Sequence, residues 1–172
     1  MTLLELFIDK TTKPKEKIVT ISDWLLDGSL PIEELVVFAE KAKDSDKASC
    51  IESIEFATKQ NAKIADENVL IFVTKSLDER APRIKWESAK VIGNIAHLFS
   101  TNLNKTIEHL LNNARHDGTV VRWAPSYALG EIIKLKTKHN THLIPTIESM
   151  CGIEENNGVK KKYLDALKKL KK

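Results

Sequence analysis

Two tryptophans, Trp86 and Trp123, carry the chemistry in this sequence that is best suited to binding. Large aromatic side chains bury much area at a low entropic cost and dominate the binding energy of interfaces. A lysine, Lys90, follows the first tryptophan and a tyrosine, Tyr127, follows the second, each at a spacing that keeps the pair on one face of a helix. The pattern predicts an aromatic and basic binding surface built from two helices.

Helical periodicity extends this surface to six candidate residues. At about 100° per residue, the apolar stripe that starts at Val121 faces the core, and Trp123 faces the opposite side. The candidate partner-binding residues are Trp86, Lys90, His97, Trp123, Tyr127 and Lys134. We expect the two indoles to lie exposed and side by side, with Gly93 and Gly130 leaving a shallow trough. The alternative is that each indole folds over the neighbouring repeat and packs between repeats.

A basic residue recurs near the start of the same helices. The members of this basic ladder are Lys47, Lys85, Arg122 and Lys160. The ladder could bind a line of phosphates or carboxylates. We favour a structural interpretation, in which each cation pairs with an aspartate of the preceding turn. Asp117 and Arg122 are the pair that the sequence defines best.

Patterns for catalysis or metal binding are nearly absent from the sequence. It contains no glycine-rich phosphate loop, nucleophile elbow or His-Glu-x-x-His helix. His139 and His142 form one short pair, without a nearby carboxylate or thiol to complete a metal site. Glu52 and Glu55 could serve an enzyme that acts on a cationic base, but solvated charges are the simpler interpretation. We predict no catalytic residues, no metal and no cofactor.

A repeat of about 37 residues positions the candidate side chains. The segment from Ile84 to Ile95 aligns with the segment from Val121 to Ile132, and the alignment matches Trp with Trp and Gly with Gly. An amphipathic segment precedes each of them, so the unit is a helical hairpin that buries its apolar stripe only when neighbours stack. We expect a single domain over residues 1–172, with hairpins at about 1–27, 31–60, 66–99, 103–136 and 142–171.

These repeats resemble the HEAT repeat family. The family pattern has an aspartate in the inter-helix turn, a Val-Arg start, spaced alanines and an Ala-Leu-Gly. The best-matching copy contains Asp117, Val121, Arg122, Ala124, Ala128, Leu129 and Gly130. The preceding copy departs from the pattern, because Glu87 stands where an alanine is expected. The resemblance covers about residues 31–172 and implies an all-α fold, a HEAT-like α-α superhelix of four to five hairpins. HEAT solenoids serve unrelated partners, so the resemblance leaves the function open.

Composition argues against several other classes of protein. The chain is 42% apolar, but none of its apolar runs is long enough to span a bilayer, and its start does not resemble a secretory signal. Cys50 and Cys151 lie far apart in apolar segments, as reduced packing residues do. We expect a cytoplasmic protein. The net charge of +3 is no signature of nucleic-acid binding, and we interpret the lysine-rich end as a solvated edge.

The leading functional hypothesis is a non-catalytic scaffold that binds a peptide or protein partner on the concave face of the solenoid. The first alternative is nucleic-acid binding, with a similarity in fold type to the alkylpurine DNA glycosylases, because paired aromatic rings can stack on bases. A second alternative is a phycobilin-lyase-like protein, since those proteins also carry HEAT-type repeats. No cluster of cysteines or histidines in the sequence supports that alternative.

Overall fold

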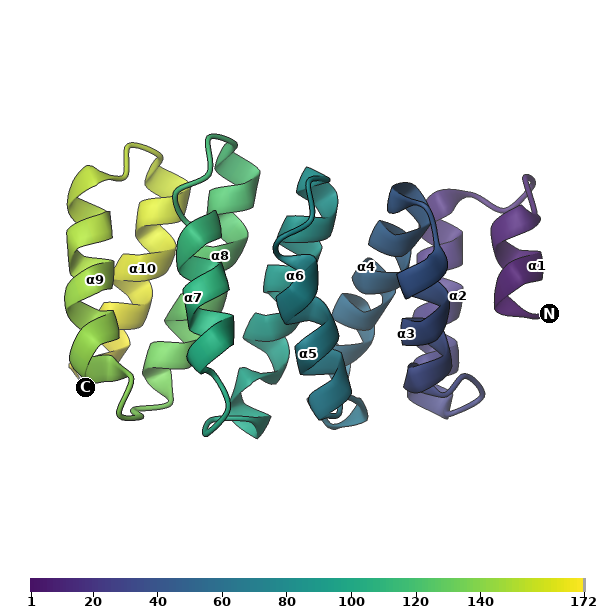
Figure 1. The fold of residues 1–172 in the computed structure, drawn as a ribbon, viewed down its shortest axis with the longest axis horizontal. Helices are drawn as coiled ribbons and strands as arrows, with labels where there is room; N and C mark the ends of the chain where they lie inside the picture. Colours follow the sequence, from purple (N-terminus) through teal and green to yellow (C-terminus); the bar gives the residue numbers. More distant parts are fainter. Residues whose placement is uncertain (172) are drawn as a thin grey trace.

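The computed structural model describes residues 1–171, which form ten α-helices and two short 3-10 turns. Figure 1 shows the helices as a single row of hairpins, with the two termini at opposite ends. The helices are α1 Leu3–Ile8, α2 Pro14–Asp27, α3 Ile32–Lys41, α4 Asp44–Gln60, α5 Glu67–Ser76, α6 Pro82–Ile95, α7 Asn104–Asn113, α8 Thr119–Lys134, α9 Asn140–Ile153 and α10 Asn157–Leu170. The all-α helical repeat solenoid that the sequence predicts is confirmed.

Local sequence signals set many of the helix ends. The side chain of Asp66 accepts a hydrogen bond from the main-chain N–H of Val69 at 3.0 Å at the start of α5, which satisfies a donor that the helix itself leaves unpaired. Pro14 and Pro82 occupy the first turn of α2 and α6, where a missing N–H costs nothing. Gly28 ends α2 with a φ of 79°, a left-handed conformation that favours glycine.

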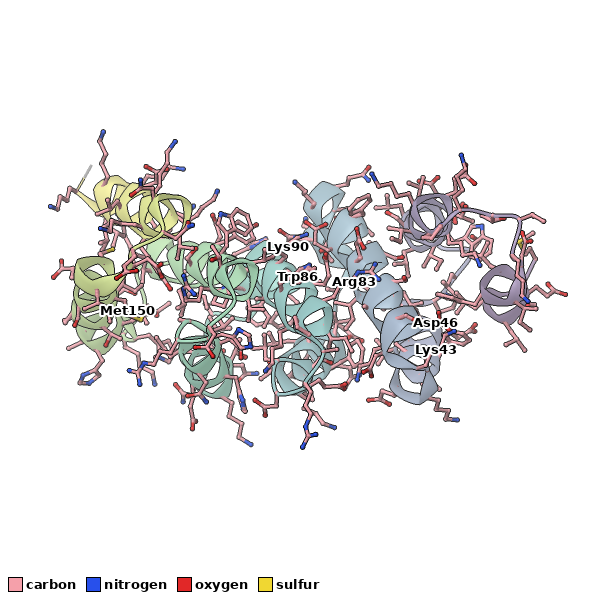
Figure 2. The ribbon with its side chains drawn as sticks, turned by 90° about the horizontal axis from the view of Figure 1, so that it is seen from above. Lys43, Asp46, Arg83, Trp86, Lys90 and Met150 are labelled. Atoms are coloured by element: carbon pink, nitrogen blue, oxygen red, sulfur yellow. The ribbon has the colours of Figure 1, made fainter. Side chains whose placement is uncertain are left out.

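The helices form two rows, which can be followed in Figure 2. The second helices of the hairpins, α2, α4, α6, α8 and α10, pack directly against one another along the row. The first helices α3, α5, α7 and α9 contact one another less. A solenoid curves toward the row whose members pack more closely, so the second helices line its inner side. We call the solvent-facing side of this row the inner face.

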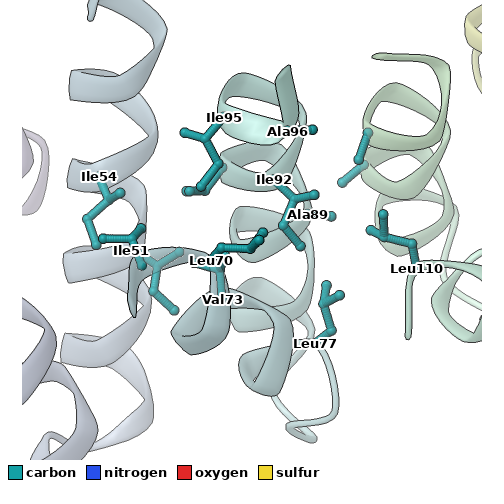
Figure 3. Close-up of a cluster of buried hydrophobic side chains, with 14 of the residues drawn as sticks. Ile51, Ile54, Leu70, Val73, Leu77, Ala89, Ile92, Ile95, Ala96 and Leu110 are labelled. Atoms are coloured by element: carbon teal, nitrogen blue, oxygen red, sulfur yellow. The ribbon is translucent and has the colours of Figure 1, made fainter. Parts of the chain in front are cut away.

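A continuous apolar core lies between the two rows. Figure 3 shows its centre, where Ile54 of α4, Val73 of α5 and Ile92 of α6 converge. All three side chains are fully buried, and burial of one such side chain is worth about 1.5–3 kcal/mol. Because α6 contributes to the packing on both of its sides, the central hairpin is a fixed base for the inner face.

Between residues 1 and 171, none of the helices combines the length and the apolarity that a bilayer crossing requires.

Candidate binding face

The candidate residues of α6 and α8 lie partly exposed on the inner face. Figure 2 shows Trp86 and Lys90 on α6, together with Arg83. Both predicted indoles are only partly exposed and also pack against the buried core. Neither the expected exposed position nor the alternative of packing between repeats describes a whole ring, because part of each indole is accessible and part packs against the core. An indole is large enough to cover the core with one side while the other contacts solvent.

The ring of Tyr127 fills the place where the sequence predicts a trough. A Cβ added at Gly93 of α6 would overlap this ring, so the tyrosine lies directly on the glycine backbone. The Tyr127 hydroxyl donates a hydrogen bond to Asn94 Oδ1 at 2.6 Å. Asn94 Nδ2 in turn donates to the carbonyl of Glu55 and to Thr58 Oγ1, both at 3.2 Å. These bonds link α8 through α6 to α4.

An aromatic and cationic stack occupies the α8 end of the inner face. The rings of Trp123 and Tyr127 are nearly parallel, with an interplanar angle of 15° and centroids 6.2 Å apart. Lys162 of α10 holds its ammonium 5.2 Å from the Trp123 ring centroid and 5.8 Å from that of Tyr127. A cation over aromatic faces is attracted by the negative centre of each ring. The three side chains therefore form a preassembled group, which we call the aromatic stack.

A buried acid lies next to Trp86. Glu87 is 4% exposed, accepts a hydrogen bond from Trp86 Nε1 at 2.9 Å, and lies 3.1 Å from the ammonium of Lys90. Burial raises the pKa of Glu87, the Lys90 ammonium lowers it in part, and the carboxylate of Glu52 raises it again. Glu52 itself pairs with Arg83 at 2.5 Å. Arg83 and Lys90, two cations of α6 on the inner face, are thus each paired with a carboxylate of the protein.

The two remaining candidates of the inner face lie at the far ends of their helices. Lys134 pairs with Glu131 of the same helix at 2.5 Å, and both side chains are about one-third exposed or less. His97 lies in the 3-10 turn after α6 and is exposed. His97 is therefore separate from the aromatic stack.

Arg122 of the basic ladder closes the turn of its own hairpin. Its guanidinium donates to the main-chain carbonyls of His116 and Asp117 at 3.0 and 2.8 Å. It also forms two hydrogen bonds to the carboxylate of Glu154, at 3.1 and 3.2 Å. The contact to Asp117 thus differs from the expected ion pair: the carbonyl points into the turn and accepts the bond, whereas the carboxylate partner comes from the next hairpin.

The other members of the ladder make different contacts: none pairs with an aspartate of its turn, and Lys160 has no side-chain hydrogen bond or ion pair with residues 1–171. Lys85 Nζ donates to the carbonyl of Leu77 at 2.9 Å, at the end of α5. Lys47 pairs with Glu79 of the next hairpin. Lys17, which the sequence alignment missed, donates to two carbonyls at the end of α1 at 2.6 and 3.1 Å. The last carbonyls of a helix lack intrahelical partners, so Lys85 and Lys17 stabilise the ends of α5 and α1.

Three important side chains of the inner face are absent from the predicted set: Glu87, Asn94 and Lys162. Glu87 carries a signal, because it is the position where the repeat departs from its alanine. Lys162 belongs to the lysine-rich end that the sequence presents as a solvated edge, and periodicity alone does not show that its stem reaches back over α8. Asn94 gives no signal, since one asparagine in a helix is usually solvated.

Within residues 1–171, no group of three or more histidines, cysteines, aspartates or glutamates is placed to hold a metal ion. Cys50 is buried, and burial raises its pKa to about 12, with Asp46 adding to the effect. A thiol held neutral in this way is a packing group rather than a nucleophile.

Comparison with known proteins shows the fold of this chain. No family model matches the sequence, and no curated protein matches it. Among solved structures, a designed armadillo repeat protein in complex with the peptide (KR)4 superposes with a TM-score of 0.74 at 18% identity, over 96% of this chain and 79% of that one. The fold of this chain is therefore an armadillo-like helical repeat solenoid.

Two further designed armadillo repeat proteins give the same result. One, described as computationally designed for modular peptide recognition, superposes with a TM-score of 0.72 at 17% identity, over 96% of this chain and 79% of that chain. Another has a TM-score of 0.67 at 19% identity and covers 98% of this chain and 80% of its own. The shared feature is the stacking of helical units, and the HEAT resemblance of the sequence fits this coarser class.

Proposed function

We propose that this chain is a non-catalytic scaffold that binds a peptide on its inner face. The observation that carries the proposal is the aromatic stack, in which Trp123 and Tyr127 are held by neighbouring helices and remain accessible. Rings that are already fixed lose little entropy when a partner covers them, so their buried area converts efficiently into affinity. Two of the designed armadillo repeat proteins with this fold are described in terms of peptide binding.

Binding rather than catalysis is favoured by how the polar side chains are used. Glu87 is engaged by Trp86 and Lys90, and Asn94 is engaged on both its oxygen and its nitrogen. A general acid or base needs a proton-transfer path to a substrate atom, whereas these groups hold the helices in register. Their role fits a fixed surface.

The proposal is tested by selecting ligands from a displayed library of short peptides and measuring their affinity by fluorescence anisotropy. Trp123→Ala should weaken binding by about tenfold or more, because truncation of a central aromatic anchor typically costs 2 kcal/mol or more. The matched control is Ile71→Ala on α5, a side chain that is 52% exposed on the outer row. Ligands that bind Trp123→Ala and the wild type equally well would refute the proposal.

Labelled single- and double-stranded oligonucleotides at about 50 and 200 mM salt provide the comparison for nucleic acid. Submicromolar affinity that falls steeply with salt and depends on Trp123, with no peptide selected, would replace the peptide proposal by the nucleic-acid alternative.

A further inference from the structure

A hollow of about 330 Å³ opens on the inner face between α8 and α10, next to the aromatic stack. Its floor is made by small residues: a Cβ at Gly130 would lie 3.1 Å from Ala166 Cβ, so the two helices approach closely there. Tyr127 contributes one wall. The hollow therefore has an aromatic side and a shallow floor, and charged side chains make up the rest of its rim.

The rim of this hollow is positively charged. Four lysines and two carboxylates line it: Lys134, Lys162, Lys168, Lys169, Glu131 and Asp165. Glu131 is already paired with Lys134. Lys162 makes no ion pair with a described residue, and its ammonium lies over the two rings of the stack. The rim thus offers a cation whose position is fixed and whose counter-charge does not come from residues 1–171.

The opposite part of the inner face has a different character. There Arg83 pairs with Glu52, and Lys90 pairs with Glu87. Each of these two cations of α6 therefore already has a carboxylate partner within the protein. A bound chain would therefore meet paired cations on α6 but, on α10, the ammonium of Lys162 without a carboxylate partner among residues 1–171.

From these observations we infer that the hollow binds an anionic side chain of a peptide, a carboxylate or a phosphorylated hydroxyl, through Lys162 and its lysine neighbours. This inference rests on the proposed peptide-binding function. The aromatic rings hold the Lys162 stem in place, so an oxyanion meets an ammonium that is already oriented. A phosphate carries about −1.5 to −2 charges and three acceptor oxygens at neutral pH, so phosphoserine binds more tightly than glutamate, and glutamate more tightly than serine.

The experiment uses fluorescein-labelled peptide libraries with one fixed central residue, phosphoserine, glutamate or serine, and random flanking positions. Anisotropy titrations on the full chain should give an affinity about tenfold higher for the phosphoserine library than for the serine library, as charge-assisted hydrogen bonds do. The preference should shrink as salt is raised, because the rim is solvent-exposed.

The decisive variants are Lys162→Gln and Lys161→Gln, which remove the same charge from adjacent positions of α10. Lys161 is exposed and lies outside the hollow, so Lys161→Gln should keep the phosphoserine preference and Lys162→Gln should abolish it. Lys162→Arg should restore most of it. Circular dichroism verifies that both glutamine variants keep their helices. An equal loss in the two glutamine variants would overturn the inference, because a general charge effect would explain it.

A second readout separates the hollow from the peptide function. Free phosphoserine is titrated while the indole N–H resonances of Trp123 and Trp86 are followed by NMR. A shift at Trp123 with none at Trp86 supports an anion in the hollow, even where no peptide is selected and the proposed function fails. Peptide binding that needs Trp123 but shows no anion preference overturns the inference and leaves the proposed function intact. Tighter binding of an oligonucleotide through Lys162 would also overturn it, by assigning the anion to nucleic acid.

Discussion

The ring of Tyr127 on α8 lies on the backbone of Gly93 on α6, in the space that any Cβ at position 93 would occupy. The same ring stacks with Trp123 and donates its hydroxyl hydrogen bond to Asn94. One tyrosine therefore determines the contact between two hairpins and also the geometry of the aromatic stack.

We predict that Gly93→Ala lowers the free energy of unfolding by about 1–3 kcal/mol, the usual cost of overpacking a well-packed core. The measurement is urea denaturation followed by circular dichroism. Removing the ring with Tyr127→Ala in the same chain should make the alanine at position 93 nearly neutral. The control is Gly152→Ala near the end of α9, where a Cβ would meet nothing within 4 Å and helix propensity favours alanine by up to about 1 kcal/mol. Equal losses of stability in Gly93→Ala and Gly152→Ala would contradict the close contact between Gly93 and the Tyr127 ring.

Alkaline pH should destabilise the fold through its tyrosines, of which the sequence contains two. Burial raises the pKa of Tyr127 to about 12, with the Glu131 and Glu55 carboxylates adding to the effect, and burial also raises the pKa of Tyr163. The folded protein thus holds these protons more tightly than the unfolded chain, whose tyrosines titrate near 10. Their contribution to stability is complete below about pH 10 and is lost as the pH rises toward 12.

The measurement for this prediction is tyrosinate absorbance recorded together with the helical signal. We expect both to change in one step, because ionisation is coupled to unfolding. Tyr127→Phe should halve the absorbance change. Tyrosinate that forms near pH 10 in a protein with intact helices would show that the phenols are accessible.

Arg122→Met should destabilise the chain by about 3 kcal/mol, since it leaves the Glu154 carboxylate without its cation. The Glu154 side chain is only 8% exposed and that of Arg122 19%, so solvent replaces the lost contacts poorly. The control is Arg115→Met, an exposed residue of the same turn, which should change stability by less than about 0.5 kcal/mol. Similar thermal midpoints for the two variants would argue against the role of the ladder.

The ion pair between Arg122 and Glu154 also predicts a loss of stability in acid. Burial raises the pKa of Glu154, but hydrogen bonds from Arg122 and the Asn156 main chain outweigh it, so that the pKa lies below its ordinary value. The stabilisation from this carboxylate is present above the pKa of the unfolded chain and is lost as the pH falls through the folded pKa. Glu154→Gln should therefore show a weaker loss of stability in acid than the wild type.

Glu87→Gln should make the chain more stable at neutral pH. The raised pKa of Glu87 means that its contribution is most favourable when the group is protonated and becomes less favourable as the pH rises through the folded pKa. A glutamine keeps an acceptor for Trp86 Nε1 and removes the buried charge. The difference between variant and wild type, followed by thermal unfolding at several pH values, should shrink in acid. The matched comparison is Glu52→Gln, which removes the more exposed of the two carboxylates. A loss of stability in Glu87→Gln at pH 7 would show instead that the ion pair between Glu87 and Lys90 dominates.

The sequence predicts the fold well because the repeat itself is visible. Trp86 and Trp123 coincide in the alignment, and the hairpins follow from that register. The site is predicted less completely, since the register gives the face of a helix but not the direction of a long side chain. The trough expected at Gly93 was inferred from the backbone alone, and the Tyr127 ring that fills it comes from another helix.

The basic ladder shows the same limit. Its positions follow from the repeat, but the acceptor that Arg122 reaches depends on how the carbonyls of the turn are oriented. Lys17 was missed because the first hairpin is shorter than the others and falls outside the offset of 37 residues. The single-domain organisation, the cytoplasmic location and the HEAT assignment within the wider class of helical repeats stay predictions.

The hydrogen bonds from Tyr127 through Asn94 to the end of α4 give the solenoid a mechanical property. In a repeat array each unit contacts only its neighbours, so bending is usually distributed along the whole row. Here a polar bridge at buried and partly buried positions joins three successive inner helices, so we expect bending to concentrate in the hairpins beyond it. Under load or thermal motion we expect the middle of the inner face to keep its shape while the two ends of the solenoid move relative to it.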